Sequence, residues 1–552
     1  AEAQVSVSQG TVEDTMGCSH PEPRQQTGKS HMKKNHDTRS GSRRLAVAGL
    51  VVLLCGCALS AADERPNIVL IMVDDMGFSD LGCYGGEVDT PNLDRLASSG
   101  LRFSQFYNGA KCSQSRSMLL TGRYFTEAGM NLAGSATIAE ALGGAGYTTL
   151  MTGKWHLQSH PVDVGFSRYF GHLSGATNFF HGDNTFRLDR ETFKVPKEGF
   201  YTTDANTDYA IQFLEETKDS KKPFFLYIAY NAPHYPLMAH KEDIAKYRGR
   251  FSEGWDILRR RRYKRVKELG LLGGDWPLTP RPKDVPSWDS LSEKDRKWEA
   301  YTMEVYAAMI DRVDQNIGRL MKKIDTLGAS ENTLFMFLSD NGGCPFQRTK
   351  TKRDVPGHTP ESYITYHKPW ANLSNTPFRL YKQNQHEGGI STPLIVHWPR
   401  VISKGGDVTH AMGHITDLMA TCLEVAGAKY PKTNSRGQKV LPMRGSSLAP
   451  IFRGGTREAT DPVFFHFSSN RAVRSGKWKL SWAGKGPWEL YDMDKDRTEL
   501  VDLSAKFPAR AKEMAASWEQ WFKATAGGSF KGRKKNNKAN KNNRKNKSPQ
   551  GG

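Results

Sequence analysis

Four continuous apolar runs, each ending in a cluster of polar residues, constrain the fold of this chain more than any other feature. The runs span residues 67–73, 147–152, 223–230 and 333–338. A run that is apolar at nearly every position, instead of at every second one, is typical of a strand that is covered on both faces. We therefore expect these segments to be buried strands of a parallel α/β sheet, with the fold beginning at Pro66.

Helical patterns lie between these runs. They span residues 137–143, 207–216 and 301–327, and the last places its apolar side chains on roughly one side. Asp311 and Asp314 of that segment are expected to face solvent. Strands that alternate with helices predict a large, doubly wound, mainly parallel sheet flanked by helices.

The pattern changes after Gly427. Residues 471–482 and 488–492 are short, alternating and aromatic-rich, which predicts a smaller antiparallel sheet, and residues 506–522 predict a packed helix. The tail is rich in Asn and Lys and too poor in apolar residues to form a core, so we expect it to be disordered. We divide the chain into an upstream extension with an export signal (1–62), an α/β domain (63–427), a C-terminal α+β subdomain (428–526) and a disordered basic tail (527–552).

Residues 33–62 have the pattern of an export signal. Basic residues precede an apolar run at 45–54, and small residues follow at 60–62. Because that run is too short to span a bilayer stably, we expect an exported protein, periplasmic or secreted, without a stable membrane span. Residues 54–57 resemble a lipobox, so a lipoprotein is the alternative to the cleaved, soluble form that we prefer.

The formal net charge of +20 is unevenly distributed. Nine units come from residues 531–547 and two from residues 1–62, which leaves +9 for the body, an excess compatible with an anionic substrate. The basic run at 259–267 invites a nucleic-acid interpretation. We prefer a solvated helix on an insertion at 240–300 and expect no nucleic-acid partner.

Polar residues that follow the apolar runs are candidates for a site, because open α/β sheets place their sites at the carboxyl ends of parallel strands. Asp74 with Asp75 and Asp340 with Asn341 are pairs of hard oxygen ligands, which fit Ca²⁺ or Mg²⁺ better than zinc. Each pair alone could equally be a turn or a helix cap.

Four basic residues near these strand ends are further candidates. Lys154 and His156 follow the second run, His234 follows the third, and Lys382 lies five residues before Glu387. Taken alone, such residues are more often exposed or structural than functional.

The stretch from Cys112 to Arg116 places a sulfur nucleophile ahead of an apolar helical run, with a cation one turn along. A cysteine near the positive end of a helix suits the handling of anions. A buried structural cysteine is the alternative. The other cysteines of the body, Cys83, Cys344 and Cys422, are too widely spaced to indicate a disulfide framework or a zinc site.

Residues 112–123 resemble the signature of the formylglycine-dependent sulfatase family, a branch of the alkaline phosphatase superfamily, which reads C-x-P-S-R followed by a helix and T-G-R. Gln114 stands where the family usually has proline. Residues 153–156 are similar to the family's G-K-W-H motif, and the resemblance, nearest to bacterial arylsulfatases, extends over about 66–522.

The resemblance implies a role for each candidate. Cys112 would be oxidised to formylglycine by a formylglycine-generating enzyme, and one Ca²⁺, with Mg²⁺ as the alternative, would be held by Asp74, Asp75, Asp340, Asn341 and the modified residue 112. Arg116 and Lys154 would anchor the hydrated aldehyde, His234 and Lys382 would bind the sulfate, and His156 would remove the proton that leads to sulfate release.

The function implied is hydrolysis of sulfate monoesters, arylsulfatase-like, on a sulfated small molecule or sugar. A phosphonate or phosphate ester hydrolase of the same superfamily is one alternative. A non-catalytic binder of sulfated glycans, in which Cys112 stays a thiol, is the other.

Overall fold

The computed structural model describes residues 64–458 and 460–526. The expected export signal and basic tail therefore lie outside the described residues, and the domain boundary at 427 stays a prediction. Among the helices of the described ranges, none combines the length and the apolar character needed to cross a membrane.

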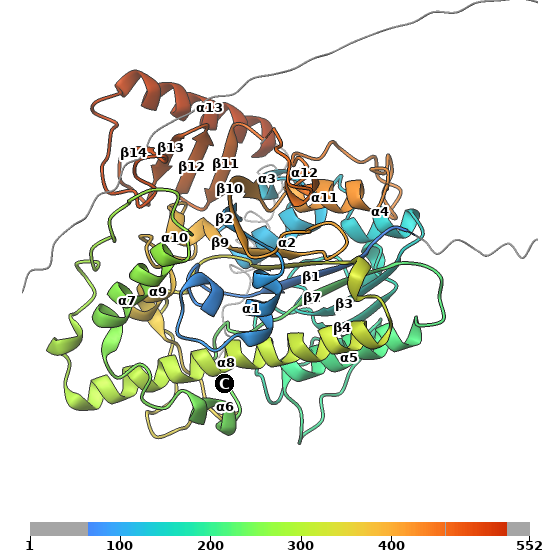
Figure 1. The fold of residues 1–552 in the computed structure, drawn as a ribbon, viewed down its shortest axis with the longest axis horizontal. Coiled ribbons are helices and arrows are strands. Elements are labelled where there is room, and N and C mark those ends of the chain that lie inside the picture. The colour runs from blue at the N-terminus through green and yellow to red at the C-terminus, as the bar shows by residue number, and fades with distance from the viewer. Residues whose placement is uncertain (1–63, 459, 527–552) are drawn as a thin grey trace, which may run out of the picture. The chain divides into compact units, whose positions relative to one another are not determined.

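A ten-stranded sheet forms the centre of the described chain (Figure 1). Its strand order is β10-β2-β9-β8-β1-β7-β3-β4-β5-β6, and the five strands from β8 to β4 are all parallel. The four predicted apolar runs form β1, β3, β7 and β8, which confirms the mainly parallel, doubly wound sheet. The strands are β1 Asn67–Val73, β2 Leu101–Tyr107, β3 Thr148–Gly153, β4 Arg168–His172, β5 Phe186–Leu188, β6 Glu191–Thr192, β7 Phe224–Ala229, β8 Thr333–Ser339, β9 Ser391–His397 and β10 Asp407–His414.

Strand β1 shows why these runs are apolar throughout. Val69 and Ile71 belong to one hydrophobic core, while Leu70 and Met72 belong to a second core. Successive side chains of a strand point to opposite faces, so a strand between two helical layers must be apolar at every position.

Helices cover both faces of the large sheet (Figure 1). Side chains of α1, α5, α6, α7, α8 and α9 contribute to the first core, and those of α2, α4, α11 and α12 to the second. The helices are α1 Pro91–Ser98, α2 Cys112–Thr121, α3 Phe125–Ala128, α4 Ile138–Gly144, α5 Thr202–Glu216, α6 Lys241–Lys246, α7 Gly254–Glu268, α8 Glu293–Thr326, α9 His367–Ser374, α10 Glu387–Ile390, α11 Asp417–Val425 and α12 Ala449–Phe452.

Helix α8 corrects one sequence-based expectation. It starts at Glu293 rather than at residue 301, and both Asp311 and Asp314 are buried instead of facing solvent. Asp314 accepts hydrogen bonds from the backbone N–H groups of Asn92 (3.1 Å) and Leu93 (2.8 Å). The reason is that the first turn of α1 docks on α8 and needs an acceptor for its free N–H groups.

Helix α7 corrects a second expectation, that its basic run is simply solvated. Arg260 and Arg261 are exposed, but Arg259 and Arg262 are buried. Arg262 forms an ion pair of 2.8 Å with Asp80, and a second pair with Glu87. Arg262 thus anchors the insertion to the loop after β1, whereas Arg259 donates to the Asn372 carbonyl at 3.2 Å.

A separate four-stranded antiparallel sheet follows, as predicted. Its strands are β11 Val463–Phe467, β12 Asn470–Ser475, β13 Trp478–Trp482 and β14 Trp488–Asp492, and α13 is Pro508–Ala526. Met514 and Trp518 of α13 pack on Leu480 and Leu490 of this sheet. A buried carboxylate, Glu387 at the start of α10, ties it to the large sheet through Lys479 at 2.7 Å.

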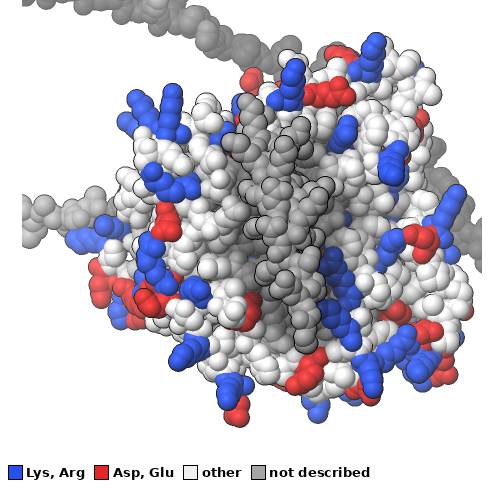
Figure 2. All heavy atoms as spheres, turned by 180° about the vertical axis from the view of Figure 1, so that it is seen from behind, with Lys and Arg blue, Asp and Glu red and all other residues white. Residues whose placement is uncertain are grey.

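The surface charge is mixed on the face drawn in Figure 2. Blue Lys and Arg side chains stand among red Asp and Glu side chains over this face. The visible part of this face therefore carries no single broad basic surface.

Candidate active site

The pairing of β1 with β8 brings the two acidic pairs together. These strands are parallel neighbours with Val73 opposite Ser339, so the residues that follow them emerge side by side. The Asp340 N–H donates to the Val73 carbonyl at 3.1 Å, and the Asp75 N–H donates to Asp340 Oδ1 at 3.2 Å. Residues 265 positions apart in the sequence thus share one buried site.

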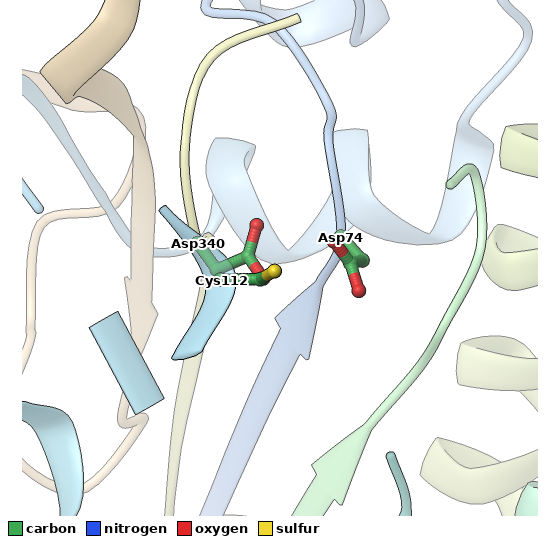
Figure 3. Close-up of side chains that lie close together, drawn as sticks. All are labelled: Asp74, Cys112 and Asp340. Carbon is green, nitrogen blue, oxygen red and sulfur yellow. The ribbon is translucent and has the colours of Figure 1, made fainter. Parts of the chain in front are cut away.

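Cys112 is the first residue of α2 and joins this site. Its Sγ and carboxylate oxygens of Asp74 and Asp340 all lie within 4.8 Å of one another. Figure 3 shows Cys112 beside the carboxyl group of Asp340, with Asp74 at the end of β1 next to them. All three residues are buried.

Arg116, one turn along α2, contacts the carboxylates of Asp74 and Asp340. Its Nη2 is 3.3 Å from Asp74 Oδ2 and 3.1 Å from Asp340 Oδ2, and its Nη1 donates to the Lys154 carbonyl at 2.9 Å. Burial opposes the charge on Arg116, but Tyr227 and the two carboxylates together raise its pKa above the ordinary value. Arg116 therefore remains charged and fixes the relative position of β1, β8 and α2.

Ser115 is a site residue to which the sequence analysis gave no role. Its hydroxyl donates to the Asp340 carbonyl at 2.5 Å and accepts from the Gly109 N–H at 2.9 Å. Ser115 thus holds the start of α2 against the end of β8. Its place inside the C-x-P-S-R-like signature was the signal that could have identified it.

Three further candidates surround the acidic pairs. Lys154, directly after β3, donates to Asp74, and Lys382, from the loop between α9 and α10, donates to Asp75. His234, after β7, has Nε2 3.5 Å from Asp75 Oδ2 and Nδ1 2.6 Å from the Tyr235 carbonyl oxygen. The residues that follow the four neighbouring parallel strands β8, β1, β7 and β3 thus lie together at one site.

Three oxygens of this site fit a metal ion. Asp74 Oδ1, Asp75 Oδ2 and Asn341 Oδ1 are buried and have no hydrogen-bond partner within the described ranges. The Asn341 side chain donates its N–H to Asp75 Oδ1 at 2.7 Å, which leaves its own oxygen as the free acceptor. Buried acceptors without partners are costly, and oxygen donors of this kind suit Ca²⁺ or Mg²⁺.

The charges of the cluster also favour a bound cation. The carboxylates Asp74, Asp75 and Asp340 match three cations, Arg116, Lys154 and Lys382. Burial and the neighbouring Asp74 carboxylate raise the pKa of Asp340 well above its usual range, so its negative charge is poorly compensated. A bound divalent cation would compensate it and give the site a surplus of positive charge that favours an anionic ligand.

The histidines are uncharged near neutral pH. Burial, together with Lys154 and Arg116, lowers the pKa of His156 to about 2, and its Nδ1 has no partner within the described chain. Burial lowers the pKa of His234 to about 4, although Asp75 and Asp74 act in the opposite direction. His156 is the one candidate for which no direct contact with the other candidates is seen in the described residues.

Comparison with known proteins identifies the family. The family model described as Sulfatase matches residues 66–428. The chain belongs to the sulfatase family. A second model, described as the C-terminal part of N-sulphoglucosamine sulphohydrolase, matches residues 378–521, which include the antiparallel sheet.

Individual sulfatases are similar over most of their length. The arylsulfatase of Klebsiella aerogenes is 33% identical over 74% of this chain and 97% of its own length. The N-acetylgalactosamine-6-sulfatase of Mus musculus is 28% identical over 81% of this chain and 78% of its own. The crystal structure of Ps i-CgsB in complex with k-i-k-neocarrahexaose has a TM-score of 0.60 and 26% identity, and the similarity covers 83% of this chain and 93% of that chain.

These sulfatase relatives indicate a hydrolase of sulfuric esters. An arylsulfatase is among them, together with a sulfatase named for a sugar sulfate, so the resemblance noted in the sequence holds at the level of the family.

Proposed function

We propose that this sulfatase hydrolyses sulfate monoesters with arylsulfatase-like activity, using formylglycine formed from Cys112 and one divalent metal ion, Ca²⁺. The products are inorganic sulfate and an alcohol or phenol. The observation that carries this proposal is the convergence of Cys112 with oxygen ligands and cations at the ends of four parallel strands.

Two groups would complete the site. Asp74, Asp75, Asp340 and Asn341 would hold the metal ion, which supplies positive charge that polarises a sulfate oxygen. Residue 112, once it is formylglycine and hydrated, supplies the nucleophilic oxygen.

The chain's own cations orient these groups. Lys154 and Arg116 both contact Asp74 Oδ2, which leaves Asp74 Oδ1 free as a ligand atom. Burial opposes ionisation of Asp74, but Lys154, His234 and Arg116 lower the pKa of its carboxyl well below the usual range. The carboxylate is therefore available near neutral pH.

Lys382 and His234 would bind the substrate sulfate. Both side chains lie against Asp75, where an incoming anion would meet the Lys382 ammonium group and the His234 imidazole. The two His234 ring nitrogens face two acceptors, Tyr235 O and Asp75 Oδ2. An added anion raises the affinity of this imidazole for a second proton, which His234 Nε2 would pass to the leaving oxygen.

His156 would act as the proton acceptor in sulfate release. Its imidazole is neutral at pH 7, because its pKa lies near 2, and its Nδ1 is free within the described chain. Gly175 packs on the ring, since a Cβ at that position would lie 2.6 Å from His156 Nε2. A side chain at position 175 would therefore displace the imidazole.

The test is a paired assay on the full chain co-expressed with a formylglycine-generating enzyme. We expect release of 4-nitrophenol from its sulfate ester at a rate well above that from its phosphate ester. EGTA should abolish the activity, and added Ca²⁺ should restore it.

Two outcomes would overturn the proposal. Dominant turnover of the phosphate ester would identify a phosphate or phosphonate ester hydrolase. An unmodified thiol at Cys112 in protein from the native host, together with binding of sulfated glycans, would identify a non-catalytic binder. The reason to test for a binder is Gln114, which stands at the position of the family's proline.

A further inference from the structure

A line of aromatic rings and cations leads away from His234. The His234 ring stacks on Tyr235 with 4.3 Å between centroids and an angle of 28°. The Tyr235 ring lies 6.3 Å from the ring of Tyr363. Exposure rises along this line, because His234 is buried, Tyr235 and Tyr363 are half-buried, and the two cations on them are exposed.

The first cation, Arg348, is held in place by a hydroxyl group and two aromatic rings. Its Nη1 donates to the Tyr235 hydroxyl at 2.9 Å, and its guanidinium carbon lies 5.5 Å from the centre of the Tyr235 ring and 5.2 Å from that of Phe346. No carboxylate within the described ranges forms an ion pair with it. Its remaining N–H groups are thus available to an external anion.

The second cation, Lys350, is held in a similar way. Its Nζ lies 4.5 Å from the centre of the Tyr363 ring, and it too forms no ion pair with the described acidic residues. Its backbone N–H donates to the Tyr363 carbonyl at 3.0 Å, and the Arg348 N–H donates to Thr365 Oγ1 at 3.1 Å. These two bonds fix the backbone of the segment, so the backbone loses little conformational entropy when a ligand binds.

Tyr235 links this pair of cations to the chemistry. Its ring stacks on the His234 ring, and His234 Nε2 lies 3.5 Å from Asp75 Oδ2. The His234 imidazole thus connects the ring that carries Arg348 to Asp75.

We infer that Arg348 and Lys350, on the rings of Tyr235 and Tyr363, form a subsite for a second anionic group of the substrate. This inference rests on the proposed function and refines its substrate class. The preferred ligand is a saccharide that carries a further sulfate or carboxylate beside the sulfate ester in the catalytic site. The sugar ring would pass beside the two half-buried tyrosines, and the second anion would meet the guanidinium and ammonium groups.

Binding measurements test this subsite independently of turnover. The Ca²⁺-loaded full chain with Cys112→Ala cannot form formylglycine, so calorimetry on it reports affinity alone. The probes are galactose and glucosamine monosulfates, each paired with its disulfates. We expect at least one disulfate to bind about ten-fold more tightly than its parent, and added Arg348→Gln and Lys350→Gln substitutions to remove that preference.

Matched variants separate the subsite from general attraction. Lys352→Gln removes an exposed cation of the same segment, one for which no ring contact is seen among the described residues, and it should leave the preference within two-fold. Tyr235→Phe keeps the ring but removes the hydroxyl that accepts from Arg348, so it should lower the preference about three-fold.

Three results would overturn the inference: every disulfate binding within two-fold of its parent, a preference that survives the double substitution, or an equal loss in Lys352→Gln. Failure of the proposed function would show separately, as chains with formylglycine at position 112 that bind these sugars but release no sulfate.

Discussion

At the scale of single residues, the site is held together by side chains that each contact residues from more than one part of the chain. Arg116 contacts the carboxylates after β1 and β8 together with the backbone after β3. Asn341 gives its N–H groups to Asp75 and to its own neighbour, so only its oxygen is left for a ligand. Removing the Asn341 side chain should therefore disturb metal binding more than the fold, whereas removing Arg116 would leave two buried carboxylates without this cation.

The first prediction concerns Asn341. Ca²⁺ at a hundred-fold excess over its Kd should stabilise the wild-type chain by about 2.7 kcal/mol, because only the folded chain presents the ligands. Asn341→Ala removes one free oxygen and should cut this stabilisation by more than half. Thermal unfolding with Ca²⁺ and with EGTA measures it, and equal shifts in both proteins would show that Asn341 is not a ligand.

The second prediction concerns Lys382. Lys382→Met should lower kcat/KM for 4-nitrophenyl sulfate by about 10²- to 10³-fold, because a fixed cation at the reacting sulfate is lost. The control is Lys368→Met on α9, whose ammonium group is exposed and pairs with Asp284. If Lys382→Met retained activity within three-fold of the wild type, Lys382 would have no part in the chemistry.

At the scale of elements, the parallel strands were predictable because burial on both faces leaves a continuous apolar run. The gathering of polar residues after these runs was also predictable, because parallel strands end at the same edge of a sheet, whereas Cys112 was singled out by its signature. The arginines of α7 were not predictable, since charge density alone does not show which side chain is buried. The partner of Arg262, Glu87, lies 175 residues away in the sequence.

The contact of Arg348 with Tyr235 could likewise not be predicted from the sequence, because it joins two irregular segments 113 residues apart. The backbone hydrogen bonds that hold these segments follow no periodic pattern. Sequence periodicity therefore identifies the strands that carry the proposed catalytic groups, but not the loops that would select the substrate.

The third prediction concerns α7. Arg262→Ala should destabilise the fold by about 3–5 kcal/mol, because it leaves Asp80 buried without its cation. Arg261→Ala on the preceding residue, where the side chain is exposed, should change stability by less than about 0.5 kcal/mol. Urea unfolding distinguishes the two, and equal effects would contradict the anchoring role of Arg262.

At the scale of the whole molecule, stability should depend on buried neutral histidines. Burial lowers the pKa of His172 and of His414 to about 3, and that of His466 to about 4. The unfolded chain takes up protons at these rings near pH 6.5, and the folded chain does not. Stability is therefore lost as the pH falls below about 6.5.

The fourth prediction follows from this linkage. Asp314, whose pKa burial raises to about 6, acts in the opposite direction and offsets part of the effect. We expect a net loss of about 3 kcal/mol between pH 7 and pH 5, measured by urea unfolding at the two values. His414→Gln should make the profile less steep. Equal or greater stability of the wild type at pH 5 would contradict the neutral, buried state of these rings.

The central claim is that conversion of Cys112 turns this buried cluster into a sulfatase site. It is tested most directly by measuring sulfate release from 4-nitrophenyl sulfate in preparations with different fractions of formylglycine at position 112, each fraction determined by peptide mass. We predict a specific activity that is proportional to the converted fraction and zero for the unconverted thiol. Activity in unconverted chains, or none in fully converted, Ca²⁺-loaded chains, would contradict the claim.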